Sequence, residues 1–344
     1  MRQPSPDPRS PVHGEKAGLA SVSGDSPSTG AGERVKASPV NLVAPADVVI
    51  AFALPILTAI SWALPEPWWR RIGAAVAPLS LRMLTADPAS AVRRIGEVLR
   101  GQPVAASAET IVEELAGASF EATLQYLRDY RPGGWNPALR LSGREHVEAA
   151  LGRGSGVILW LADFVFRDVP TKIAFHRAGY AVSHLSHPRH GLSETRLGMR
   201  ILNRVPAVCG DRYLRERVML SLDGAVAAMR TLQRRLRENG VVSITAGMRA
   251  QHPVAVPLLG REIPLAPGAP DLAHRTRAAL LPVFPVRDSA GLITVTVHPP
   301  IEVPDNVPRR AASAAAARQF AALLEAQVLE HPGQWLSWFD FLDG

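Results

Sequence analysis

The hydrophobic pattern of the chain centres on one uninterrupted apolar run, residues 156–162. A run without alternating polar positions is typical of a strand that is buried on both faces of a sheet. It ends in two acids, Asp163 and Asp168, and a helix is expected over residues 169–178, closed by Gly179. Open α/β folds place their sites where such strands pass into helices, so we expect a site here.

The spacing of the two acids leaves two interpretations open. Asp168 is expected at the start of the helix, where the helix dipole favours an anion, and Asp163 on the preceding loop. The two carboxylates then either face one crevice, or serve as a helix cap and an unrelated loop acid.

Strand-like and helical runs alternate over residues 138–300. Further strands are expected at 181–186, 207–208 and 241–245, and further helices at 192–203 and 218–238. This order predicts an α/β fold with a mixed, mostly parallel sheet covered by helices. A last pair of strands, 280–287 and 292–298, is predicted to form an antiparallel hairpin.

The residues before this core divide into two parts. Residues 1–43 are rich in Pro, Ser, Gly and Ala and are expected to be disordered. Residues 44–135 are expected to be helical, with helices at 89–99 and 108–129, and the α/β domain is expected to span 136–344.

The apolar run 48–64 carries no charge over about the length of a minimal membrane span. Pro55 is expected to kink it, and the aromatic and basic sequence 68–71, Trp-Trp-Arg-Arg, follows directly. That order is typical of an anchor at a membrane interface. A single span, a helix lying in the interface and a buried helix of a soluble bundle all remain open.

Composition restricts the classes of ligand that the protein is expected to bind. The formal net charge is +7, and almost every cation is an arginine, which binds phosphate and carboxylate in a bidentate way. Arg189, Arg249 and Arg287 are candidates for such a contact, although a GC-rich genome also explains the arginines. The sequence shows neither basic clusters interleaved with aromatics nor zinc-ligand spacing, so nucleic-acid binding and a metal site are not expected. The lone Cys209 excludes an internal disulfide and is expected to be a small buried residue.

Four blocks, in order, resemble the bacterial lipid A biosynthesis acyltransferases, the lauroyl and myristoyl transferases and their relatives. The blocks are residues 139–159, 256–273, 278–287 and 320–335. In that family the strand ends in His-x4-Asp/Glu, where the His is taken as general base and the acid as its orienting partner. Here Asp168 keeps the acid, Asp163 stands in place of the His, and Arg167 replaces an aromatic residue that often precedes the acid. A family stretch like Pro-Asp-Gln is also lost, replaced by residues 245–249.

The resemblance implies a membrane-associated acyltransferase at the cytoplasmic face of the bacterial inner membrane, without a cofactor. The donor would be an acyl-carrier-protein or CoA thioester, and the acceptor a hydroxyl or amine of a glycolipid or a metabolite. Asp163 and Asp168 are the expected catalytic residues. Four residues are expected to bind substrate: Arg167, Arg189, Arg249 and Gly260.

Because the motif His is missing, both the source of the catalytic base and the function have several alternatives. An ordinary aspartate is a poorer base than histidine, but two neighbouring acids can raise the pKa of one of them, an effect that Arg167 would oppose. A histidine from outside the motif is another source of a base; the nearby ones are His176, His184, His187 and His190. Two other functions remain possible: a non-catalytic relative that binds an acyl carrier or lipid, and an enzyme of a secondary-metabolite pathway that performs a different transfer.

Overall fold

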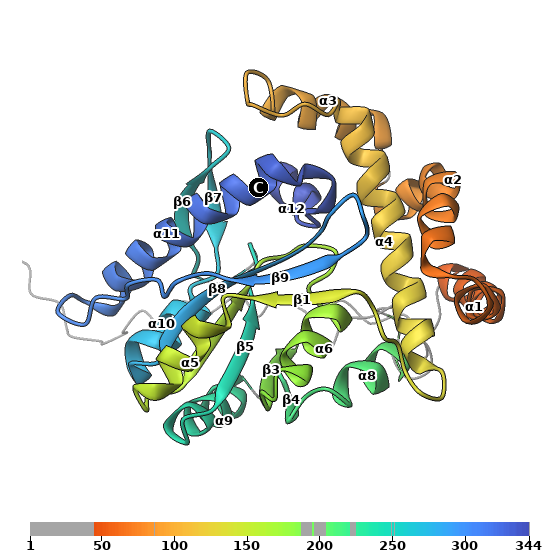
Figure 1. Cartoon of the computed structure of the whole chain (residues 1–344). Coiled ribbons are helices and arrows are strands. Elements are labelled where there is room, and N and C mark those ends of the chain that lie inside the picture. Colours follow the sequence, from red (N-terminus) through yellow and green to blue (C-terminus); the bar gives the residue numbers. More distant parts are fainter. Residues whose placement is uncertain are drawn as a thin grey trace, which may run out of the picture. The chain divides into compact units, whose positions relative to one another are not determined.

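A computed structural model describes residues 45–85, 87–186, 195, 204–220, 225–248, 250 and 252–343. Its main sheet has seven strands in the order β1-β9-β8-β2-β5-β3-β4 (Figure 1). The strands are β1 Leu139–Ser142, β2 Val157–Leu161, β3 Val182–Ser186, β4 Glu216–Met219, β5 Val241–Thr245, β8 Ala279–Arg287 and β9 Ile293–Val297. All pairs are parallel except β8 with β9, which confirms the mixed, mostly parallel sheet and the antiparallel hairpin.

Strand β2 lies at the centre of the sheet and is buried along its whole length. Val157 lies opposite Val241 of β5 on one side and opposite Ala279 of β8 on the other. Because side chains alternate along a strand, Ile158 and Trp160 enter the larger core. The other three side chains of β2 enter a smaller core. The apolar run is therefore explained by a strand with a core on each face.

The helices cover both faces of this sheet. α5 and α6 pack on the smaller core, while α11 and the hairpin of β6 Val254–Leu258 and β7 Arg261–Leu265 lie on the opposite side (Figure 1). These helices and the others of this region are α5 Arg144–Gly152, α6 Val169–Arg177, α8 Arg204–Asp211, α9 Ala225–Arg237, α10 Gly268–Thr276, α11 Arg309–Glu330, the 3₁₀ helix η1 Pro332–Gln334 and α12 Trp338–Asp343.

Four helices precede the sheet: α1 Pro45–Ala63, α2 Glu66–Leu84, α3 Pro88–Val98 and α4 Ala108–Tyr130. The expected helices at 89–99 and 108–129 are confirmed as α3 and α4, whereas α2 was not expected. α1 continues through Pro55. It is joined to α4 by two side chains, since Ser61 Oγ donates to Leu124 O (2.8 Å) and Trp62 Nε1 donates to Leu127 O (2.7 Å).

The expected pair of interfacial tryptophans is divided between the core and the surface. Trp69 is only 2% exposed; it packs against Trp135, and the guanidinium of Arg128 lies over its ring. Trp68 is 50% exposed and carries Arg71 over its ring. The assignment of Trp69 to an interfacial anchor is therefore wrong, because helical periodicity turns it towards α4 and away from Trp68.

In the described part of the chain, no helix is both long and apolar enough to cross a membrane.

Two other expectations are wrong. Residues 207–208 belong to helix α8, since a two-residue apolar run has no periodicity that separates a strand from a helix. Residues 216–219 form β4, which pairs with β3, so the expected helix at 218–238 does not include residues 218 and 219; its later part is confirmed as α9 Ala225–Arg237. The expected helix at 192–203 lies outside the described residues.

The two adjacent tryptophans of α2 provide a test of this packing. We expect Trp69→Ala to lower the free energy of unfolding by about 3–5 kcal/mol, because it opens a cavity beside Trp135. The control Trp68→Ala should change it by about 0.5 kcal/mol or less. Urea denaturation of both variants measures the difference, and equal losses would contradict the assignment of Trp69 to the core.

Candidate active site

The two motif acids lie where the sequence predicts them, after the carboxyl end of β2. Asp163 lies on the loop between β2 and α6, residues 162–168, which we call the acid loop. Asp168 occupies the N-cap position of α6. The dipole of a helix favours an anion at that position.

The Asp163 carboxylate has one partner on each oxygen. Its Oδ2 accepts a hydrogen bond from Ser337 Oγ (2.6 Å), and its Oδ1 lies 2.7 Å from Arg167 Nη1 in an ion pair. That ion pair lacks hydrogen-bond alignment, so Oδ1 is buried without a hydrogen bond from any described residue. The side chain of Asp163 is 21% exposed.

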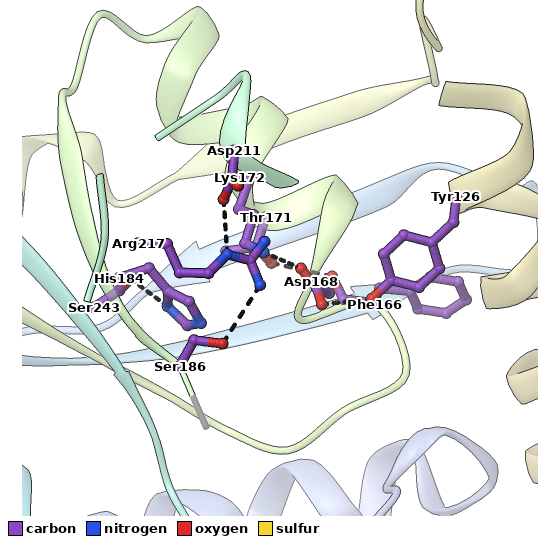
Figure 2. A network of polar contacts seen from close by, with 10 residues as sticks. All are labelled: Tyr126, Phe166, Asp168, Thr171, Lys172, His184, Ser186, Asp211, Arg217 and Ser243. Atoms are coloured by element: carbon purple, nitrogen blue, oxygen red, sulfur yellow. Dashed lines mark hydrogen bonds and ion pairs between the residues drawn. The ribbon is translucent and has the colours of Figure 1, made fainter. Parts of the chain in front are cut away.

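Asp168 is held by different partners, as Figure 2 shows. Tyr126 Oη donates to its Oδ2 (2.5 Å), and Lys172 Nζ pairs with its Oδ1. Burial raises the pKa of Asp168, but the charge and hydrogen bond of Lys172 and the hydrogen bond of Tyr126 outweigh burial and hold that pKa well below its ordinary value. This is the opposite of the raised pKa considered for an acid pair, because Asp168 has its own cation, Lys172, four residues ahead.

The positive charge of Arg167 interacts with both acids. Burial opposes its charge, but Asp163 and then Asp168 outweigh that effect and raise the pKa of the guanidinium. The side chain is 23% exposed. Its observed role is charge compensation within the acid loop; its predicted role in substrate binding remains a prediction.

His184 is the described histidine beside Asp168. Its Nδ1 lies 2.8 Å from Ser243 Oγ (Figure 2). Burial, and then the charge of Lys172, lower the pKa of His184 to about 3, so the ring is neutral at neutral pH. The ring lines a cavity of about 10 Å³, also bounded by Thr171 and Phe175, with room for about one water molecule. A lipid acceptor does not fit there.

A second cation, Arg217, lies close to Lys172. Arg217 on β4 pairs with Asp211 (2.7 Å) and donates to Ser186 Oγ (3.4 Å) (Figure 2). A Cβ atom on Gly210 would lie 2.7 Å from both Arg217 Nη2 and Lys172 Nζ, so these two cationic groups converge on that glycine.

Several other candidates have clear structural positions. Arg287 forms an ion pair with the buried Glu121 and lies over the ring of Phe166, so it is neither a surface arginine nor a free anion contact. Gly260 lies in the two-residue turn between β6 and β7 with φ 73°, which favours glycine; its substrate contact remains a prediction.

Arg189, Arg249, His187 and His190 lie outside the described residues. His176 is exposed on α6, with its ring against Tyr213.

Sequence reasoning placed Arg167 beside the acids but missed their other partners. Lys172 follows Asp168 by four residues, a helical spacing that predicts an ion pair. Tyr126 and Ser337 had no such signal, because they are 42 and 174 residues away from the acids they contact. Cys209 is buried as expected, with its Sγ donating to Tyr126 O (3.2 Å), and burial raises the pKa of its thiol to about 12.

The depressed pKa of His184 predicts a pH-dependent stability. The unfolded chain protonates this ring below about pH 6.5 while the folded protein does not, so stability is complete above that pH and falls as the pH drops towards 3. We expect the wild type to lose about 2 kcal/mol more than His184→Asn between pH 6.5 and pH 5. Urea unfolding of both proteins at the two pH values measures this, and parallel losses would contradict it.

The chain matches a known protein family over most of its length. The sequence model of a family described as bacterial lipid A biosynthesis acyltransferase matches residues 42–340, which include all four helices before the sheet, the whole sheet and the acid loop. A comparison with curated proteins finds no match. Since the family match covers most of the chain, the protein belongs to the bacterial lipid A biosynthesis acyltransferase family.

Proposed function

We propose that this protein is a membrane-associated acyltransferase in which Asp163 takes the place of the family's histidine base. It moves an acyl chain from a carrier-protein or CoA thioester to a hydroxyl or amine of a lipid or metabolite acceptor. The observation that carries the proposal is the state of Asp163, whose buried Oδ1 accepts no hydrogen bond from the described residues. Such unused capacity calls for an explanation, and catalysis supplies one.

The reaction requires one base. The acceptor oxygen or nitrogen forms a bond to the acyl carbon, the thioester C–S bond breaks, and the acceptor's proton passes to Asp163 Oδ1 and then to the leaving thiolate. Arg167 compensates the charge of Asp163 before the proton arrives.

Asp168 has a different part in this proposal. Lys172 and Tyr126 keep it ionised, so it acts as a fixed negative charge that helps to hold Arg167 and the start of α6. Its low pKa excludes it as the group that carries the proton near neutral pH.

A second candidate function is binding without catalysis. The observation that favours it is the pairing of both carboxylates with cations, Asp163 with Arg167 and Asp168 with Lys172. A protein of this kind would hold an acyl carrier or a lipid and show no turnover with any thioester donor.

The proposed membrane contact is a surface on α1 and α2. Phe52 and Ile56 are 77% and 64% exposed on α1, and Leu79 and Met83 are 63% and 64% exposed on α2. Each pair is four residues apart and therefore lies on one face of its helix. Exposed apolar side chains along one face of a helix are typical of proteins that bind a membrane surface. Trp68 with Arg71 adds an interfacial pair on α2.

The role of Asp163 is tested by Asp163→Asn, which keeps the shape of the side chain and removes the base. We expect turnover to fall by about 100-fold or more. The assay is intact-mass detection of acyl transfer from mixed acyl-carrier and acyl-CoA thioesters to a lipid extract and an extract of small metabolites. Asp305→Asn, a change to an exposed acid that pairs with Arg277, is the control. Full turnover by Asp163→Asn would remove Asp163 from this role.

The membrane surface is tested without disturbing Trp69. We expect replacement of Phe52, Ile56, Leu79 and Met83 by Ser to release the protein from vesicles of phosphatidylethanolamine and phosphatidylglycerol, measured by flotation. Val226→Ser with Val307→Ser, also at exposed apolar positions, is the control and should still float. Equal flotation of both variants would contradict the assigned surface.

A further inference from the structure

The carboxyl-terminal residues of the described chain pair directly with the acid loop. Residues 334–337, which we call the C-terminal segment, run from the last residue of η1 to the start of α12. Val165 N donates to Gln334 O and Leu336 N donates to Asp163 O, both at 2.9 Å, and Phe164 forms an antiparallel bridge with Trp335. The backbone of Asp163 is therefore held by a segment more than 170 residues away in sequence.

Ser337 has little freedom in this segment. Trp335 and Trp338, on either side of it, are 1% and 0% exposed, and their rings meet edge to face with centroids 4.9 Å apart. Trp338 Nε1 also donates to Pro332 O (2.8 Å). Ser337 itself is 5% exposed, so its hydroxyl is held in place before any substrate binds.

We infer that Ser337 is a positioning residue that orients the Asp163 carboxylate for acyl transfer. Its hydroxyl holds Oδ2 at 2.6 Å, while Arg167 faces Oδ1 at 2.7 Å. With these two contacts the carboxylate cannot turn, and Oδ1 remains the oxygen that takes the acceptor's proton. The inference rests on the proposed function of Asp163.

A purely structural role of Ser337 predicts a different result, and the chain offers a matched comparison. Ser313 is also buried, at 1% exposure, and its Oγ donates to a carboxylate, Asp271 Oδ1, at 2.5 Å. This serine lies on α11 and its partner on α10, outside the acid loop. Ser313→Ala therefore removes the same kind of hydrogen bond without touching Asp163.

The experiment compares Ser337→Ala, Ser313→Ala and Ser337→Thr in the full chain. Thermal unfolding and steady-state kinetics are measured for each, with the donor and acceptor identified by the intact-mass assay. We expect both alanine variants to lower the melting temperature to a similar extent. Ser337→Ala should lower kcat by about 10-fold to 100-fold with KM within about twofold, because the base is misplaced and ground-state binding is not. Ser313→Ala should keep kcat within about twofold, and Ser337→Thr, which keeps the hydroxyl, should recover most of it.

A double variant makes the result independent of how well the threonine fits. If Ser337 acts through Asp163, then Ser337→Ala should have no further effect on kcat once Asp163 is Asn. Equal kcat values for Ser337→Ala and Ser313→Ala, or additive losses in the double variant, would overturn the inference while leaving Asp163 as the base. Full turnover by Asp163→Asn, or no turnover by the wild type, would overturn the proposed function and this inference together.

Discussion

The site depends on the position of β2, which is hydrogen-bonded to β5 and β8 and buried on both faces. A central strand with no exposed edge leaves little freedom in where its carboxyl end lies. The acid loop begins there, and Ala162 N continues the pairing by donating to Val283 O (2.9 Å). The candidate active site is thus attached to the most constrained part of the sheet.

Charge compensation is the second constraint on the site. Asp163 and Arg167, and Asp168 and Lys172, form ion pairs four residues apart, and Arg167 also feels Asp168. Four charges therefore lie close together without a net excess of either sign. In this arrangement the loss of one cation would leave a partly buried carboxylate unpaired. The free-energy cost of that unpaired charge exceeds the free energy that the ion pair contributes.

The contacts of Asp163 fit the proposed departure from the family pattern. In the proposed replacement of the family's histidine by Asp163, Arg167 supplies the positive charge that matches the added carboxylate. Ser337 then satisfies the second oxygen of Asp163. The charged groups of the acid loop and Ser337 therefore form a connected set of contacts.

The sequence by itself determined the α/β class, the buried central strand, α3, α4, α6 and the β8–β9 hairpin, because each is encoded in hydrophobic periodicity or local turn residues. It also placed both acids after β2. It could not separate Trp69 from Trp68, since which side of α2 faces α4 is decided by packing. Only the tertiary structure brought Tyr126 and Ser337 to the acids, because contacts between segments 42 and 174 residues apart leave no trace in local sequence patterns.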